Sequence, residues 1–305
     1  MKRCFFRRIS AAGVALFLVA ITSLPAAAGN SVTELNGSNG NPLSPATGFI
    51  GGGLAGPVGV AIDSSGNVWV SNNANGLGNS VTELKSDGTP ISPSSGFTGG
   101  GLAGPEGIAI DLAGNVWVAN NASNKGDSVT ELKSDGTPIS PSSGFTGGGL
   151  AGPWSIAVDT SCNIWVANNA GASVTELKST GTLVPGSPFT GGGLSGPKGI
   201  ALDGAGNVWV ANSAGASVTE LNGSDGSAIS PSGGFTAAGL SAPDGIAIDR
   251  SGDVWVANAG GASVTELLGV AKPVIKPSLT PGARLIGAKR RLSARQTPAP
   301  TAAND

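Results

Sequence analysis

Chemically different side chains occupy one position of an otherwise repetitive chain. Five times, a proline is followed by a residue that changes in kind while its neighbours barely change. These residues are aliphatic, acidic, aromatic, basic and acidic in turn: Val58, Glu106, Trp154, Lys198 and Asp244. An aromatic ring near carboxylates and a lysine is the kind of surface that binds a carbohydrate or a peptide. Drift of an exposed position is the competing explanation.

Asparagine-rich segments form the second candidate for binding. They follow each repeated tryptophan, and their length varies from NNANGLGN at 72–79 and NNASNKGD at 120–127 to NNAGA at 168–172. We expect them on the same face as the five variable residues. The predicted ligand site therefore includes one asparagine from each segment: Asn72, Asn120, Asn168, Asn212 and Asn258.

Residue types that most catalytic chemistry needs are missing. The chain contains no histidine and no tyrosine, which removes the usual general base, a Ser–His triad and every zinc site with a histidine ligand. We assign no catalytic residue and expect no cofactor. Glu106, Asp244 and nearby asparagines could still supply the oxygen ligands that Ca²⁺ or Mg²⁺ prefers, so an enzyme of that kind stays an alternative and the metal ligands stay open.

The elements that position these side chains are repeats. Tryptophans in an N/D-V/I-W-V context recur at intervals in the mid-forties, and residues 80–105 and 128–153 are identical. In one copy, GIAID and NVWVAN predict two apolar strands, SVTEL predicts a third, and GTPISPSSGFT predicts a proline-bearing outer strand. Such a period with four short strands is typical of a propeller blade. The variable residues then stand just before each first strand, where the channel opens.

Repeated residues are expected to build the blades. A glutamate occurs in every SVTEL peptide and an aspartate closes every first strand, so turn capping and solubility explain them before function does. The repeated tryptophans should fill the core between blades: Trp69, Trp117, Trp165, Trp209 and Trp255. Trp154 has no counterpart in the other copies.

At this level the chain resembles known families. Units such as GPEGIAIDLAGNVWVAN followed by SVTEL resemble NHL repeats, and the G-N-V-W-V-A-N core resembles virginiamycin B lyase (streptogramin lyase) and its relatives. The resemblance covers roughly residues 30–268 and implies a radial array whose first strands line a central channel. It is specific for a β-propeller and unspecific for activity. The lyase relatives are understood to use a catalytic histidine and a magnesium ion, and this chain has no histidine.

The predicted fold is all-β, a β-propeller of four-stranded blades with five full repeats plus a split or partial sixth blade. The N-terminal SVTEL and the segment up to Ile50 supply a third and a fourth strand before the first complete copy. Either five blades close with one redundant strand, or residues 270–279 and those that follow complete a sixth blade, which we favour. The propeller then spans residues 29–279, and a basic, disordered tail spans 280–305.

The first 28 residues are predicted to be a signal peptide. Basic residues precede the apolar run AAGVALFLVAITSL, which is too short for a membrane span, and small residues at Ala26–Ala28 form a cleavage site. We expect a secreted or periplasmic protein without a membrane span after cleavage; an uncleaved anchor is the alternative. Cleavage removes Cys4 and leaves Cys162, in a surface turn, so the mature chain cannot form an internal disulfide.

Charge limits the partners. All 19 acidic residues except Asp305 lie between residues 30 and 267, where only six of the 17 basic residues lie. Nucleic acid is therefore excluded as a partner, because phosphate binding needs a basic surface. We predict a monomeric, exported, non-catalytic propeller that binds a carbohydrate, a peptide or a cell-envelope component at the channel mouth. A metal-dependent lyase or lactonase and a passive extracellular structural protein are the alternatives.

Export should yield a chain that begins at Gly29, because the small residues Ala26 and Ala28 fit the pockets of the signal peptidase. The intact mass of the exported protein measures this directly. A species that retains residues 1–28 and sediments with membranes would contradict the prediction.

Overall fold

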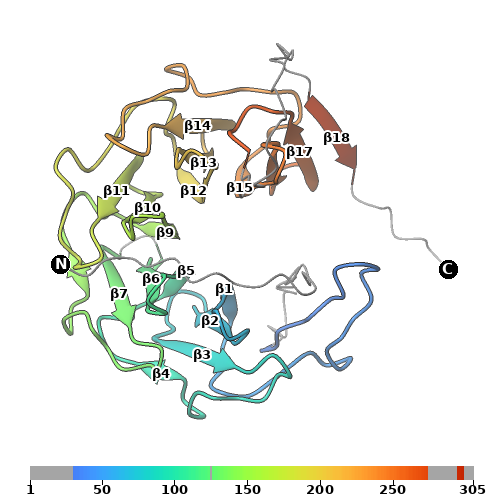
Figure 1. Cartoon of the computed structure of the whole chain (residues 1–305), viewed down its shortest axis with the longest axis vertical. Coiled ribbons are helices and arrows are strands. Elements are labelled where there is room, and N and C mark those ends of the chain that lie inside the picture. The colour runs from blue at the N-terminus through green and yellow to red at the C-terminus, as the bar shows by residue number, and fades with distance from the viewer. Residues whose placement is uncertain (1–29, 124–125, 274–293, 299–305) are drawn as a thin grey trace, which may run out of the picture. The chain divides into compact units, whose positions relative to one another are not determined.

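The computed structural model describes residues 30–123, 126–273 and 294–298. The chain divides into two compact units: unit 1 is Met1–Val166 with Glu176–Val184, and unit 2 is Ala167–Thr175 with Pro185–Asp305. Within the described ranges every regular element is a β-strand (Figure 1). In that part of the chain, no helix is long and apolar enough to cross a membrane.

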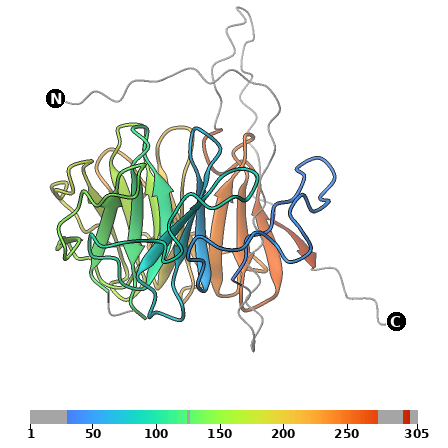
Figure 2. The same cartoon turned by 90° about the horizontal axis from the view of Figure 1, so that it is seen from below.

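Unit 1 contains two four-stranded sheets of consecutive antiparallel strands. The first has the order β1 (Pro57–Ile62), β2 (Val68–Asn72), β3 (Ser80–Leu84) and β4 (Phe97–Thr98). The second has the order β5 (Pro105–Ile110), β6 (Val116–Asn120), β7 (Ser128–Leu132) and β8 (Phe145–Thr146). The first strands β1, β5 and β9 contact one another in turn. Figure 2 shows the strands of this unit, blue to green, standing next to one another with loops at both ends.

The remaining sheets follow the same plan. The third consists of β9 (Pro153–Val158), β10 (Ile164–Asn168) and β11 (Ser173–Leu177), and its residues are divided between the two units. Unit 2 contains a sheet of β12 (Pro197–Leu202), β13 (Val208–Asn212) and β14 (Ser217–Leu221). Its other sheet contains β15 (Pro243–Ile248), β16 (Val254–Asn258), β17 (Ser263–Leu267) and β18 (Ala294–Pro298).

These sheets confirm the predicted fold class, an all-β propeller with antiparallel blades of up to four strands. The second and third strands match the sequence pattern closely, since SVTEL forms β7 and its counterparts without a shift. Isolated bridges pair Val32 with Phe49 and Leu35 with Pro42, as expected for a third and a fourth strand ahead of the first sheet. Most residues that a sixth blade would need, from 274 to 293, lie outside the described residues, as does the predicted signal peptide.

One expectation about the edges of the sheets needs correction. The fourth strand, predicted over residues 136–146, is reduced to the two residues of β8 and one bridge from Leu132 to Pro138. Proline offers no N–H for a regular ladder. Between the two prolines the Ser140 hydroxyl, and not a main-chain carbonyl, accepts the Glu131 N–H at 3.0 Å. Residues 294–298, which lie within the predicted C-terminal tail, pair with β17 as strand β18.

Indole rings occupy the spaces between sheets. Trp69, Trp117, Trp165 and Trp209 are at most 1% exposed. Trp117 packs with Ile156, Ile164 and Leu177, which belong to the third sheet. Each indole Nε1 also donates to the aspartate that closes the first strand, as from Trp117 to Asp111 at 3.2 Å. The predicted core role of these four tryptophans is therefore confirmed.

The fifth repeated tryptophan departs from this pattern. Trp255 is 36% exposed, and Val264 on the neighbouring strand β17 is 38% exposed, whereas its counterpart Val218 is fully buried. The pairing of Ala257 with Val264 extends this exposed surface along the sheet. The prediction of five equally buried tryptophans is therefore wrong for Trp255.

Buried carboxylates link the turn after the first strand to the third strand. The Asn67 Nδ2 donates to Asp63 Oδ2 at 3.1 Å and to Glu83 Oε1 at 3.0 Å. Burial and the nearby Asp63 charge raise the pKa of Glu83 to about 7, although the bond from Asn67 opposes the shift. Burial and the nearby Asp159 charge likewise raise the pKa of Glu176 to about 7. Both glutamates are only 3% exposed, so they belong to the buried interior of their blades.

Trp117→Ala should lower the free energy of unfolding by about 3–5 kcal/mol, because it leaves a cavity between two sheets. Trp255→Ala should cost less, since a third of its surface already contacts solvent. Denaturant midpoints of the two variants measure the difference. Equal losses would contradict the packing described for these residues.

Replacing Glu83 and Glu176 with glutamine should flatten the dependence of stability on pH. Their folded pKa values are raised above the ordinary 4.5, so their contribution is present below pH 4.5 and is lost as pH rises through about 7. The wild type should therefore lose more stability than the double variant between pH 4.5 and about pH 8.

Melting temperatures across this pH range measure the effect. Glu266→Gln is the matched control, because Glu266 occupies the same SVTEL position but is only partly buried. Parallel profiles of wild type and double variant would show that these glutamates do not titrate as described.

Candidate binding site

The variable residues belong to the first strands rather than preceding them. Val58 and Glu106 are the second residues of β1 and β5. The register of the pairing between β5 and β6 shifts between Pro105 and Ile108. The register of β1, β12 and β15 also shifts just after the proline that begins each strand. A bulge of this kind redirects a side chain away from the alternation of the strand. The expectation that these residues lie outside the strands is therefore wrong.

Three variable residues are neighbours in unit 1. A Cβ atom on Gly107 would lie 2.8 Å from the carbonyl oxygen of Trp154, so the backbones of β5 and β9 meet there. A Cβ atom on Gly59 would collide with the carbonyl oxygen of Glu106. Glycine after the variable residue thus permits the close approach of successive first strands. Val58 is 40% exposed, while Glu106 and Trp154 are partly buried.

Two residues outside the predicted ligand site hold Glu106 in place. The Asn73 Nδ2 donates to Glu106 Oε1 at 3.0 Å. The Ser71 hydroxyl donates to the main-chain carbonyl of Glu106 and accepts the Gly59 N–H at 2.8 Å. The available signal was that Ser71 stands where the other copies carry alanine.

Long loops flank the same two junctions. The loop between Asn72 and Ser80 is anchored to the next blade by a bond from Gly104 N to Gly78 O of 2.6 Å. The loop between Asn120 and Ser128 is anchored likewise, from Gly152 N to Gly126 O at 2.8 Å. These anchors lie two residues before Glu106 and Trp154, respectively.

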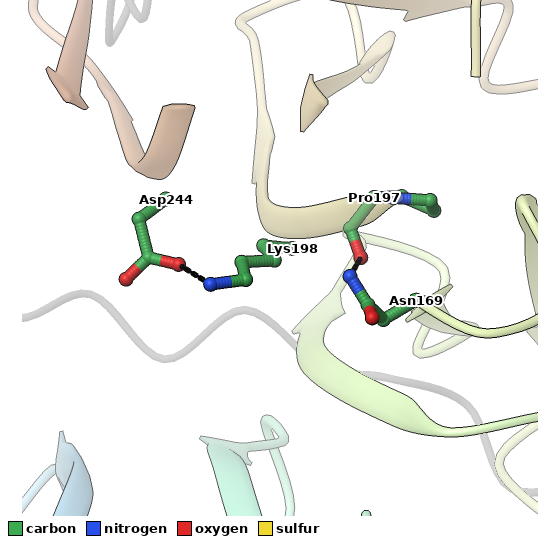
Figure 3. A network of polar contacts seen from close by, with 4 residues as sticks. All are labelled: Asn169, Pro197, Lys198 and Asp244. Carbon is green, nitrogen blue, oxygen red and sulfur yellow. Dashed lines mark hydrogen bonds and ion pairs between the residues drawn. The ribbon is translucent and has the colours of Figure 1, made fainter. Parts of the chain in front are cut away.

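Lys198 and Asp244 are neighbours in unit 2 and neutralise each other. Lys198 Nζ lies 2.7 Å from Asp244 Oδ1 (Figure 3), with side chains 21% and 43% exposed. A Cβ atom on Gly199 would lie 2.7 Å from the Asp244 carbonyl oxygen, so β12 and β15 meet as β5 and β9 do. On the other side of Lys198, Asn169 Nδ2 donates to the Pro197 carbonyl at 3.4 Å.

The predicted asparagines have a structural task. All five are at most 4% exposed: Asn72, Asn120, Asn168, Asn212 and Asn258. The Asn72 Nδ2 donates to Ser80 Oγ and Thr82 Oγ1 at 3.1 and 3.0 Å, and its Oδ1 accepts the Ala55 N–H at 3.1 Å. Each asparagine therefore joins the second strand to the third, and it is the next residue, Asn73, that reaches the variable position.

Possible chemistry at this site is limited by its residues. Among the residues that the structure describes, no three Asp, Glu or Cys side chains lie close enough together to hold a metal ion. Cys162 occupies the left-handed turn position with φ 64°, but it is 5% exposed rather than a surface residue.

Comparisons with known proteins agree on the fold. The chain matches no protein-family model and none of the curated proteins. It is similar to the crystal structure of virginiamycin B lyase from Staphylococcus aureus, with 17% identity, a TM-score of 0.59, and coverage of 89% of this chain and 78% of that chain. A streptogramin B lyase structure has 18% identity and a TM-score of 0.59 over 82% of this chain and 78% of that chain.

The structure of a gluconolactonase from Xanthomonas campestris has 18% identity and a TM-score of 0.52, with coverage of 71% of this chain and 74% of that chain. The expected resemblance to β-propellers of this kind is thereby confirmed at the level of the fold. At these identities the likeness is one of fold, and it transfers neither an activity nor a substrate.

Proposed function

We propose that this chain is a binding or interaction propeller without catalysis, which recognises a carbohydrate, a peptide or a cell-envelope component through its variable residues. One observation carries the proposal. The repeated polar side chains form hydrogen bonds within the blades. Val58, Glu106 and Trp154, in contrast, differ in chemical type, are partly exposed and lie on successive first strands. A ligand without the symmetry of the repeats needs such differences.

The N-terminal sequence supports export of the protein to the periplasm or the medium, and we propose that it acts there as a monomer. The acidic repeat region disfavours nucleic acid as a partner. The passive structural alternative predicts that no soluble ligand binds at the variable residues.

A metal-dependent lyase or lactonase is the second candidate function. It is favoured by the similarity to structures named as lyases and as a gluconolactonase. Glu106 would be the first carboxylate to consider, because Asn73 already orients it. Melting in the presence of Ca²⁺ or Mg²⁺ discriminates the candidates, since a bound ion should raise the melting temperature of the wild type more than that of Glu106→Ala.

A glycan and peptide array should identify a ligand that quenches or shifts the emission of Trp154. Four of the other indoles are at most 1% exposed, whereas Trp255 is 36% exposed and could also respond to a ligand. The fluorescence titration therefore compares wild type with Trp154→Phe, with Trp255→Phe as the matched control. The signal should vanish in the first variant and persist in the second.

Affinity should also fall in Glu106→Ala, while its melting temperature should drop only modestly, through loss of the bond from Asn73. Unchanged affinity of every array ligand in Trp154→Phe and Glu106→Ala would place binding elsewhere. The drift explanation of the variable residues would then hold.

A further inference from the structure

We propose that Asn36 and Asn222 of the exported, folded chain are acceptors for N-linked glycosylation, with an oligosaccharide carried on a lipid pyrophosphate as the donor. The inference rests on the proposed export, but it does not depend on a ligand at the variable residues. It assigns one modification site to each unit of the structure.

Three asparagines of the chain stand in the tripeptide Asn-x-Ser, where x is not proline: Asn36, Asn121 and Asn222. In an exported protein this tripeptide accepts N-linked oligosaccharide when it lies in an accessible surface loop. Asn36 and Asn222 belong to the same pentapeptide, ELNGS, at 34–38 and 220–224. An enzyme that accepts the local sequence of one site therefore accepts that of the other.

Both asparagines begin the turn that follows an SVTEL strand, and this turn has its own length. The Asn36 N–H donates to the Asn41 carbonyl and the Asn222 N–H to the Ser227 carbonyl, each at 2.8 Å and each five positions further along the chain. In another copy, the corresponding bond from Lys85 N to Thr89 O reaches only four positions. The asparagines thus occur in a longer turn than the lysine does.

The longer turn leaves the amide nitrogen of each asparagine available. Asn36 Oδ1 accepts the Ser38 N–H at 2.9 Å and the Ser38 hydroxyl at 2.6 Å. Asn222 Oδ1 accepts the same two groups of Ser224 at 2.9 and 2.8 Å. Within the part of the chain that the structure describes, neither Nδ2 donates a hydrogen bond, and both asparagines are partly exposed.

This available nitrogen is the atom that the transfer needs. Asparagine Nδ2 attacks the first carbon of the sugar, and the lipid pyrophosphate leaves with the electron pair of the broken C–O bond. The nitrogen gives up one of its two protons to a base of the transferring enzyme. The product is an N-glycosidic bond, and the Oδ1 that accepts the serine groups takes no part in bond formation.

Asn121 provides a comparison within the same chain. It has the required tripeptide but is only 1% exposed, and its main-chain N–H donates to the Gly104 carbonyl at 3.0 Å. An enzyme cannot reach this side chain in the folded protein. Asn121 should therefore stay unmodified while Asn36 and Asn222 are modified.

The competing explanation is that asparagine serves only to shape the turn, since its side chain accepts nearby main-chain N–H groups well. Asn36→Asp and Asn222→Asp separate the two roles. Aspartate keeps the oxygens that accept the serine groups but lacks the amide nitrogen. Each variant should lose its glycan, while the melting temperature of the unglycosylated chain should stay that of the wild type.

The test measures the intact mass of the full chain, exported by a cell that holds an oligosaccharyltransferase and its lipid-linked oligosaccharide. Two equal increments should appear above the mass of the cleaved chain, and fragment masses should place them on Asn36 and Asn222. The same chain exported by a cell without the transferase should have neither increment. Ser38→Ala should lose the increment at Asn36, whereas Ser38→Thr keeps the hydroxyl and should retain it.

A cleaved and exported chain without increments would overturn this inference and leave the proposed export and ligand binding standing. An increment at Asn121, or one that persists when both asparagines are replaced by aspartate, would also overturn it. Because fragment masses of the wild type locate each glycan, this outcome does not depend on the folding of any variant. A chain that retains residues 1–28 in the membrane fraction would overturn both the inference and the proposed export.

Discussion

Burial of one indole between successive sheets is the interaction on which the rest of the structure depends. A tryptophan buries about 150–250 Å², which corresponds to roughly 4–6 kcal/mol as an upper value. Trp117 buries its ring against residues of the third sheet. Its Nε1 donates to Asp111 Oδ2, and Asp111 Oδ1 accepts the N–H groups of Ala113 and Asn115. The same residue thus joins a turn, a strand and the neighbouring blade.

This construction accounts for most of the polar residues. Thr130 and Ser140 both donate to the carbonyl of Gly100, which ties the glycine-rich connection to the third and fourth strands. Asn120 bonds Ser128 and Thr130 within the blade. Because Thr82 with Ser92 and Thr219 with Ser230 repeat the bonds to a glycine carbonyl in two other copies, little repeated polarity is left there for a ligand. Specificity must then come from positions where the copies differ.

The strongly shifted carboxylates follow the same logic. A perturbed pKa in a cleft often marks a functional group. Glu83 and Glu176, however, occupy equivalent positions, and each has an aspartate and an asparagine at equivalent positions of its own copy as partners. Their shifts are a consequence of blade packing. Glu106 differs, because it has no equivalent glutamate at its position in any other copy and its partner Asn73 lies in the preceding blade.

The sequence by itself determined the propeller fold, its strands and the position where function would vary. Period, apolar pattern and turn residues are local properties, so SVTEL predicts β7 residue by residue. Near-identity of the copies also made Glu106 and Trp154 visible as exceptions. The exposed Trp255 could not be predicted, because its burial depends on what covers the sheet and not on its own repeat.

Only the tertiary structure decided which polar residues meet. Asn72 and Asn73 are adjacent and chemically identical, yet one bonds Thr82 inside its blade and the other bonds Glu106 in the next. The bulge that places Glu106 within β5, the ion pair of Lys198 with Asp244, and the pairing of β18 with β17 were equally hidden. The ion pair and the pairing of β18 with β17 join segments more than 20 residues apart in the chain, whose approach is set by the packing of strands and is not encoded in any local pattern.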